Sequence, residues 1–128
     1  MKDQLNRIVD LHKKPQRIIS LVPSLTELLA DLGLQDKIVG VTRFCVHPAD
    51  IRKKAKVVGG TKQVRNKKIS KLQPDLILAN KEENQPEDIK KLEKICPVHV
   101  SDVQTIEDCY ELIDQYGRLT DTAEEAKK

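Results

Sequence analysis

Short apolar runs alternate with amphipathic segments along the chain. Continuous runs of Val, Ile and Leu are typical of strands that are buried on both faces of a parallel sheet. Such runs lie at residues 17–22, 37–42, 74–79 and 97–100, with a shorter one at 56–58. The runs predict four to five strands that alternate with helical segments, except that a loop with at most one helical turn is expected between the runs at 37–42 and 56–58.

The segment from Ser24 to Gly33 has the clearest helical pattern. Its apolar positions follow i, i+3, i+4, i+7 spacing and define one helix face. They are Leu25, Leu28, Leu29 and Leu32. Ser24 and Glu27 have the spacing of a capping box, and Gly33 is expected to end the helix.

Three further helices are predicted. One follows Asn66, a candidate N-cap, one begins at Pro86, and one spans residues 105–116. Their expected inward residues are Ile69, Leu72, Ile89, Leu92, Ile106, Cys109, Tyr110 and Ile113. Cys96 and Cys109 are expected to be small core residues, and His99 to be structural.

Alternating strands and helices predict an α/β, doubly wound, mostly parallel sheet of four to five strands with helices on both faces. Residues 1–14 are expected to form an N-terminal edge strand or extension. The α/β lobe should span residues 15–119, and another helix should begin within residues 120–128, with Thr120 or Asp121 as its cap.

The composition disfavours several classes of function. The chain has 128 residues, of which 34% are charged and 38% hydrophobic, which favours one soluble globular domain. A net charge of +3, two tyrosines and no tryptophan argue against nucleic-acid binding. No apolar run approaches the length of a membrane span, so no membrane insertion is expected.

The cysteines and the N-terminal residues indicate in which cellular compartment the protein is expected. The three cysteines lack CxxC spacing, which favours reduced thiols over a disulfide framework. The first sixteen residues contain no apolar stretch of signal-peptide length. The expectation is therefore a cytoplasmic protein as the sequence stands, and a periplasmic one only if its N-terminus was trimmed.

Ligands of open parallel sheets bind beyond the carboxyl ends of the strands. Four loops are expected at that rim: residues 22–27, 42–48, 59–63 and 80–85. The two glycines at 59 and 60 permit close approach of a ligand to the backbone. They lack the spacing of a GxGxxG motif or a P-loop, so no nucleotide is expected.

Cys45 and His47 carry the candidate chemistry of the second loop. With Glu82 and Glu83 they have the donor types of a direct Zn²⁺ or iron site. Alternatively, His47 is an axial ligand to the metal of a corrinoid or haem, or Cys45 packs inward and His47 lies on the surface. A nucleophile–base pair is disfavoured because no oxyanion donor or orienting group is evident, and no enzymatic activity is expected.

The order of the motifs RIISLVPSLTELLADLG, KIVGVT, VVGGT and LQPDLILA resembles one family. It is the N-terminal lobe of the helical-backbone substrate-binding proteins of ABC importers, particularly the cobalamin-binding branch. The resemblance covers residues 15–128. It implies two α/β lobes with the ligand between them, and residues 120–128 as the start of the helix that connects the lobes.

The resemblance also implies roles for individual residues. Phe44 falls where cobalamin-binding relatives stack an aromatic ring on the ligand, whereas Thr61 and Asn80 replace aromatic residues of those relatives. Lys67 stands near the place of a glutamate that docks into basic pockets of the permease. Since a lysine would repel such a pocket, docking to an ABC permease is not expected to follow the family's pattern.

The sequence therefore predicts a non-catalytic lobe that binds a metal-containing chelate: a corrinoid such as cobalamin, a haem or an iron–siderophore complex. A second lobe or a homodimer partner would cover the other side. The candidate ligand contacts are Phe44, Cys45, His47, Thr61, Lys62, Asn80, Lys81, Glu82, Glu83 and Asn84. The alternatives are a cytosolic metal-binding protein with a direct Cys/His/Glu site and an interaction module without a small ligand.

Overall fold

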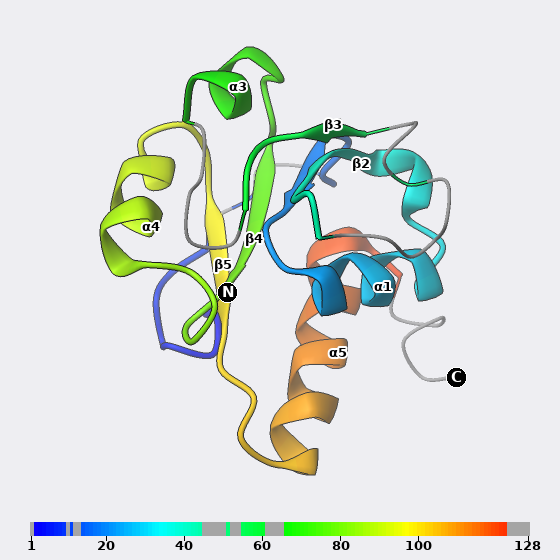
Figure 1. Cartoon of the computed structure of the whole chain (residues 1–128). Helices are drawn as coiled ribbons and strands as arrows, with labels where there is room; N and C mark the ends of the chain where they lie inside the picture. The colour runs from blue at the N-terminus through cyan, green and yellow to red at the C-terminus, as the bar shows by residue number, and fades with distance from the viewer. Residues whose placement is uncertain are drawn as a thin grey trace.

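A computed structural model describes residues 2–9, 11, 14–44, 51, 55–60 and 66–122 (Figure 1). It contains a five-stranded sheet in the order β3-β2-β1-β4-β5, with every neighbouring pair parallel. The strands are β1 (Ile18–Ser20), β2 (Ile38–Val41), β3 (Lys56–Val57), β4 (Leu76–Asn80) and β5 (Val98–Ser101). Each strand lies in or directly beside one of the predicted apolar runs, which confirms the predicted fold class.

Both faces of the sheet are buried, because successive side chains of a strand point to opposite faces. In β4, Leu76 and Leu78 join one core cluster, while Ile77 and Ala79 join the other. This alternation explains why the strands read as continuous apolar runs.

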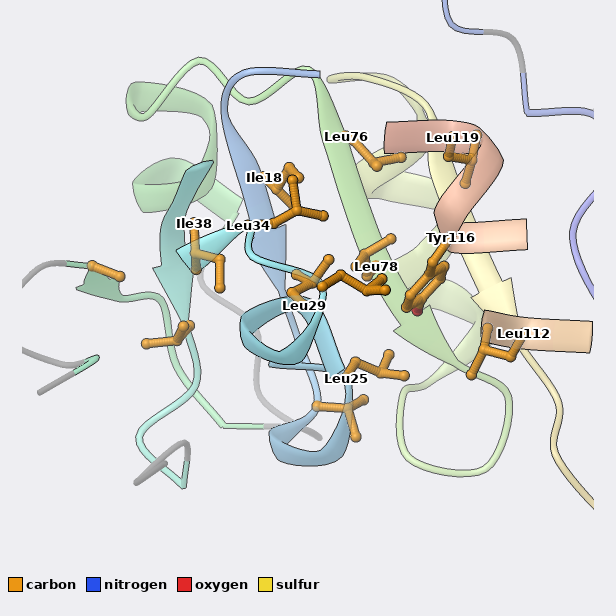
Figure 2. Packing of buried hydrophobic residues seen from close by; sticks show 14 of the residues in the cluster. Ile18, Leu25, Leu29, Leu34, Ile38, Leu76, Leu78, Leu112, Tyr116 and Leu119 are labelled. Carbon is orange, nitrogen blue, oxygen red and sulfur yellow. The ribbon is translucent and has the colours of Figure 1, made fainter. Parts of the chain in front are cut away.

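Among the described residues, two helices cover each face. Helix α1 (Pro23–Asp31) and helix α5 (Ile106–Thr120) enclose the first cluster with β1, β2 and β4, as Figure 2 shows. Helix α3 (Asn66–Lys71) and helix α4 (Pro86–Glu93) cover the second cluster. A short 3₁₀ helix, η1 (Gln35–Lys37), leads into β2.

The predicted capping box at the start of α1 is wrong. The N-cap is Val22, no side chain caps the helix, and Ser24 is its second residue. Pro23 takes the first helical position, where its fixed φ fits and its missing N–H is not needed. The end of the helix agrees with the prediction, because Gly33 has a positive φ of 81°.

The cap predicted at Asn66 is also not observed. Asn66 is the first residue of α3, and its buried Oδ1 accepts no hydrogen bond. The start of α4 agrees with the sequence, since Pro86 is its first residue and Ile89 and Leu92 are buried.

The predicted inward face of α5 is wrong as well. Ile106 is 69% exposed, Tyr110 is 67% exposed and Cys109 is exposed rather than part of the core. The buried residues of α5 are instead Leu112, Gln115, Tyr116, Gly117, Leu119 and Thr120. The first turns of α5 extend past the carboxyl end of β5, and only its later turns pack on the sheet (Figure 1).

The two ends of the described chain are held by polar contacts. Residues 2–9 form a turn with an isolated antiparallel bridge between Lys2 and Ile8, and this segment adds no strand to the five-stranded sheet. The buried Asp3 carboxylate accepts hydrogen bonds from the backbone N–H groups of Leu5, Arg7 and Val100. At the other end α5 continues through Gly117 to Thr120, and residues 123–128 lie outside the described part.

Candidate functional site

The strand order places a topological switch point beside β1. From β1 the chain proceeds to β2 and β3 on one side, whereas β4 and β5 lie on the other. Loops that follow the central strands diverge at such a point and leave a crevice beyond the carboxyl ends, where α/β proteins bind ligands.

A pocket of about 350 Å³ lies at this crevice. Its lining comes from three loops, those after β1, β2 and β4. The lining residues are Val22, Pro23, Ser24, Phe44 and Glu83. The structure thus brings Phe44 and Glu83, two of the candidate contacts, to one pocket although they are far apart in the sequence.

Phe44 presents an exposed aromatic surface at the pocket. Its side chain is 54% exposed, and the Arg43 guanidinium carbon lies 5.4 Å from the ring centroid, within the range of a cation–π contact. A β-carbon at Gly60 would lie 3.1 Å from Arg43 Nη2 and 3.4 Å from Phe44 Cε2. The bare backbone of Gly60 therefore leaves room for both side chains.

Arg43, Val22 and Pro23 fall in the predicted rim loops, but sequence reasoning did not single them out as site residues. Their only signal was position, because Val22 ends a predicted strand and Pro23 and Arg43 directly follow one. Gly60 was noted as permitting close approach of a ligand, but in the structure it accommodates side chains of the protein itself.

Two asparagines shape the loop after β4. Asn80 Oδ1 accepts hydrogen bonds from the N–H groups of Glu82 (2.8 Å) and Glu83 (3.1 Å). Asn80 Nδ2 donates to Ser101 Oγ (3.0 Å), and Asn84 Oδ1 accepts from the Asn80 N–H (2.9 Å). Asn84 is only 2% exposed, so its amide supports the loop from within. The two glutamates are exposed at the tip of this loop.

The Lys81 side chain does not line the pocket that contains Phe44. Its ammonium lies 3.8 Å from the Asp102 carboxylate, and its side chain lines a separate groove beside α4. The structure therefore does not bring Lys81 together with Phe44 and Glu83.

The pocket combines an apolar wall with two polar features. Val22, Pro23 and Phe44 provide the wall, and the Glu83 carboxylate adds a negative charge. The exposed Ser24 lies at the N-terminus of α1, where backbone N–H groups and the helix dipole favour acceptor or anionic atoms. The arrangement suits a large ligand with an apolar ring face and polar substituents.

Several candidate residues lie outside the described part of the chain. These are Cys45, His47, Thr61 and Lys62. Within the ranges that the structure describes, no three His, Cys, Asp or Glu side chains gather as a metal site. The direct metal site with Cys45 and His47 therefore stays a hypothesis.

His99 has a structural environment, as the sequence suggested. It is fully buried, its Nε2 lies 2.7 Å from Gln115 Oε1, and its ring packs edge-on against Tyr116 at 5.1 Å. Burial lowers the pKa of His99 more than the hydrogen bond to Gln115 raises it, so the neutral imidazole is favoured. Burial, aided by the Asp75 charge, raises the pKa of the half-buried Cys96 thiol to about 12, which makes it unreactive.

The chain matches the periplasmic binding protein family over residues 18–128. It therefore belongs to that family, which confirms the resemblance recognised from its motifs. Among the helices of the described residues, none is long and apolar enough to cross a membrane.

Relatives with known names agree with this membership. The chain is 37% identical over 119 residues to the uncharacterized ABC transporter substrate-binding lipoprotein YvrC of Bacillus subtilis, covering 90% of this chain and 37% of YvrC. It is 33% identical over 115 residues to a vitamin B12-binding protein of Vibrio vulnificus, covering 88% of this chain and 42% of that protein. The cytoplasmic location expected from the N-terminus finds no support in these names.

Solved structures share the fold. A possible iron-binding (periplasmic solute-binding) protein of Staphylococcus epidermidis has a TM-score of 0.81 and 36% identity, over 90% of this chain and 46% of that one. The periplasmic vitamin B12-binding protein BtuF of Vibrio cholerae has a TM-score of 0.80 and 28% identity, over 88% of this chain and 44% of that one. The chain thus spans less than half the length of the relatives described here.

Proposed function

We propose that this lobe binds a metal-containing chelate in the Phe44 pocket and does not convert it chemically. The observation that carries the proposal is an exposed aromatic ring, Phe44, in a pocket formed at the switch point of the sheet. A planar macrocycle is a natural stacking partner for an exposed aromatic ring that lines a pocket.

Each lining residue has a role in this proposal. The Phe44 ring stacks on the apolar face of the ligand, with Val22 and Pro23 beside it. Ser24 and the first turn of α1 contact acceptor groups such as amide oxygens or carboxylates. Glu83 accepts hydrogen bonds from amide or hydroxyl groups of the ligand.

A corrinoid is the first ligand to test. Relatives at 33% and 32% identity are named vitamin B12-binding proteins, and the Phe44 ring fits a corrin face. Haem and iron–siderophore complexes are the next candidates, since structural neighbours of the same fold are named for haem and petrobactin.

The pocket is one wall of a binding site. Its open side is expected to be covered by a second lobe or by a second copy of the chain, because a single wall encloses only part of a large ligand. By analogy with relatives named as periplasmic proteins or lipoproteins, we place the working protein outside the cytoplasm. Delivery to an ABC permease is part of this proposal, by analogy with the relative named as an ABC transporter substrate-binding lipoprotein. The exposed Lys67 on α3 stands near the position of the family's docking glutamate, and its positive charge disfavours docking into a basic pocket of the permease.

The first test is a titration of the chain with hydroxocobalamin and, separately, with haemin. Saturable changes in visible absorbance are expected for one of them. The Phe44→Ala variant should bind at least fivefold more weakly, because it loses a stacking contact worth about 1 kcal/mol or more.

The matched control is Ile8→Ala. Ile8 is 79% exposed but lies beside Pro97 and Val98, at the amino end of β5 and away from the pocket. This variant should bind like the wild type. Equal affinities of the wild-type and Phe44→Ala proteins would contradict the proposal, and stoichiometric zinc uptake that disappears in Cys45→Ser and His47→Ala would favour the direct metal site.

A further inference from the structure

Two exposed surfaces of opposite charge lie at different ends of this lobe. The first, here called the lysine groove, is a depression of about 280 Å³ between the edge strand β3 and helix α3. Its lining residues are Lys56, Val57, Lys68, Lys71 and Leu72.

The lysine groove has an apolar floor and a positive rim. Val57 and Leu72 are half-buried, while the three lysines are exposed. Helix α3 has no acidic residue, and none of the ion pairs seen among the described residues involves these lysines. The rim charge is therefore available to an acidic partner.

The second surface, here called the acidic ridge, consists of Ile106, Glu107, Tyr110 and Glu111 on α5. Ile106 and Tyr110 are 69% and 67% exposed and lie one helical turn apart, so they form a continuous apolar stripe. Glu107 and Glu111 lie directly beside that stripe and are exposed. An apolar stripe flanked by charges is typical of a helix face that docks in a groove.

The two surfaces cannot meet within one molecule. Helix α3 leads into the amino end of β4, whereas α5 begins beyond the carboxyl end of β5, and Figure 1 shows them at opposite ends of the sheet. They are nevertheless complementary. Each has an apolar centre, and the lysine rim of one matches the glutamate rim of the other.

We propose that the acidic ridge of one copy of the chain docks in the lysine groove of a second copy. Lysines on an edge strand also discourage pairing with foreign strands. The walls contributed by α3, through Lys68, Lys71 and Leu72, instead suit a helix laid into the groove. The inference does not depend on which ligand the Phe44 pocket binds.

This contact is heterologous, because it joins two different surfaces. Each copy keeps a free groove at one end and a free ridge at the other, so association continues head to tail unless the rotation closes a ring. Exposed charge pairs are weak and screened by salt, so the association is expected to be concentration-dependent and to weaken at high salt.

Sedimentation velocity over a concentration series tests the proposal. The weight-average mass of the wild-type chain should rise with concentration at low salt and fall back at high salt. The double variant Lys68→Glu with Lys71→Glu should associate at least tenfold more weakly, and so should Glu107→Lys with Glu111→Lys. A mixture of the two variants should associate again, because the reversed groove of one then matches the reversed ridge of the other.

The matched control is Lys91→Glu with Lys94→Glu. Both lysines are exposed near the end of α4, and their reversal changes the net charge as much as the groove variant does. This control should associate like the wild type, and circular dichroism checks that every variant is folded. A wild-type chain that stays monomeric at all concentrations, a control that loses association equally, or a mixture that fails to associate would overturn the proposal.

Discussion

At the scale of single residues, a few buried polar side chains affect the stability of this lobe. His99 of β5 and Gln115 and Tyr116 of α5 form one group, yet His99 Nδ1 and the Tyr116 hydroxyl have no hydrogen-bond partner. Burying an unpaired polar atom costs free energy, so this group is a local weak point of the core.

Stability should fall on acidification because of His99. Burial places the pKa of folded His99 below its ordinary 6.5, so the unfolded chain takes up this proton first as the pH falls. The contribution of His99 to stability is therefore present above about pH 6.5 and is lost below it, by up to about 1.4 kcal/mol per pH unit.

Urea unfolding of the wild-type and His99→Gln proteins at about pH 7 and about pH 5 measures this effect. The wild type should lose more free energy of unfolding than the variant between the two conditions. The same loss in both proteins would show that other groups, such as carboxylates, cause the entire pH dependence.

The Tyr116 hydroxyl should be dispensable. Tyr116→Phe removes a buried donor that has no partner, so the free energy of unfolding should stay equal or rise by about 1 kcal/mol. Thr120→Val is the matched comparison, because the Thr120 hydroxyl donates to the Tyr116 carbonyl at 2.6 Å and its loss should destabilise by about 1 kcal/mol. Destabilisation of both variants by a similar amount would mean that the Tyr116 hydroxyl is hydrogen-bonded in solution.

At the scale of elements, the sequence predicted which segments become strands and helices but not how every helix faces the sheet. In α5, residues 106, 110 and 113 have the same helical spacing as 112, 116 and 119. Periodicity alone therefore allowed either stripe to face inward. The choice depends on where the helix lies along the sheet, and that position is set by the length of the connection after β5.

The sequence predicted the start of one helix correctly and the start of another wrongly. Pro86 was assigned correctly, whereas Ser24 and Glu27 match a capping box that does not form, because the N-cap of α1 is Val22, two residues before Ser24. The box that does form joins Thr105 and Asp108, with the Asp108 N–H donating to Thr105 Oγ1 at 3.1 Å.

Removing the hydroxyl of Thr105 or of Ser24 should distinguish the capping box that forms from the one that does not. Thr105→Ala should lower the free energy of unfolding by about 1 kcal/mol, because it leaves an N–H group of the first turn without its acceptor. Ser24→Ala should change it by less than about 0.5 kcal/mol, since Ser24 caps nothing. Chemical denaturation measures both, and an equal loss in the two variants would contradict the assignment of the caps.

At the scale of the whole molecule, the strand order turns separate loops into one site. The sequence located the rim correctly, because the loops after parallel strands must emerge at the same edge. It did not reveal that Asn80 and Asn84 brace their own loop, or that Lys81 turns toward Asp102, because both depend on side-chain geometry within a loop. Family membership and the Phe44 pocket together support the proposed role of a chelate-binding lobe.

The most direct measurement of this central claim is an amide NMR titration of the chain with hydroxocobalamin and with haemin. The proposed function predicts saturable shifts for one ligand at Ser24, Phe44 and Glu83, beyond the carboxyl ends of the strands. Residues at the opposite end, such as Ile8 and Cys96, should not shift. Shifts that cluster at that opposite end, or no saturable shifts with either ligand, would contradict it.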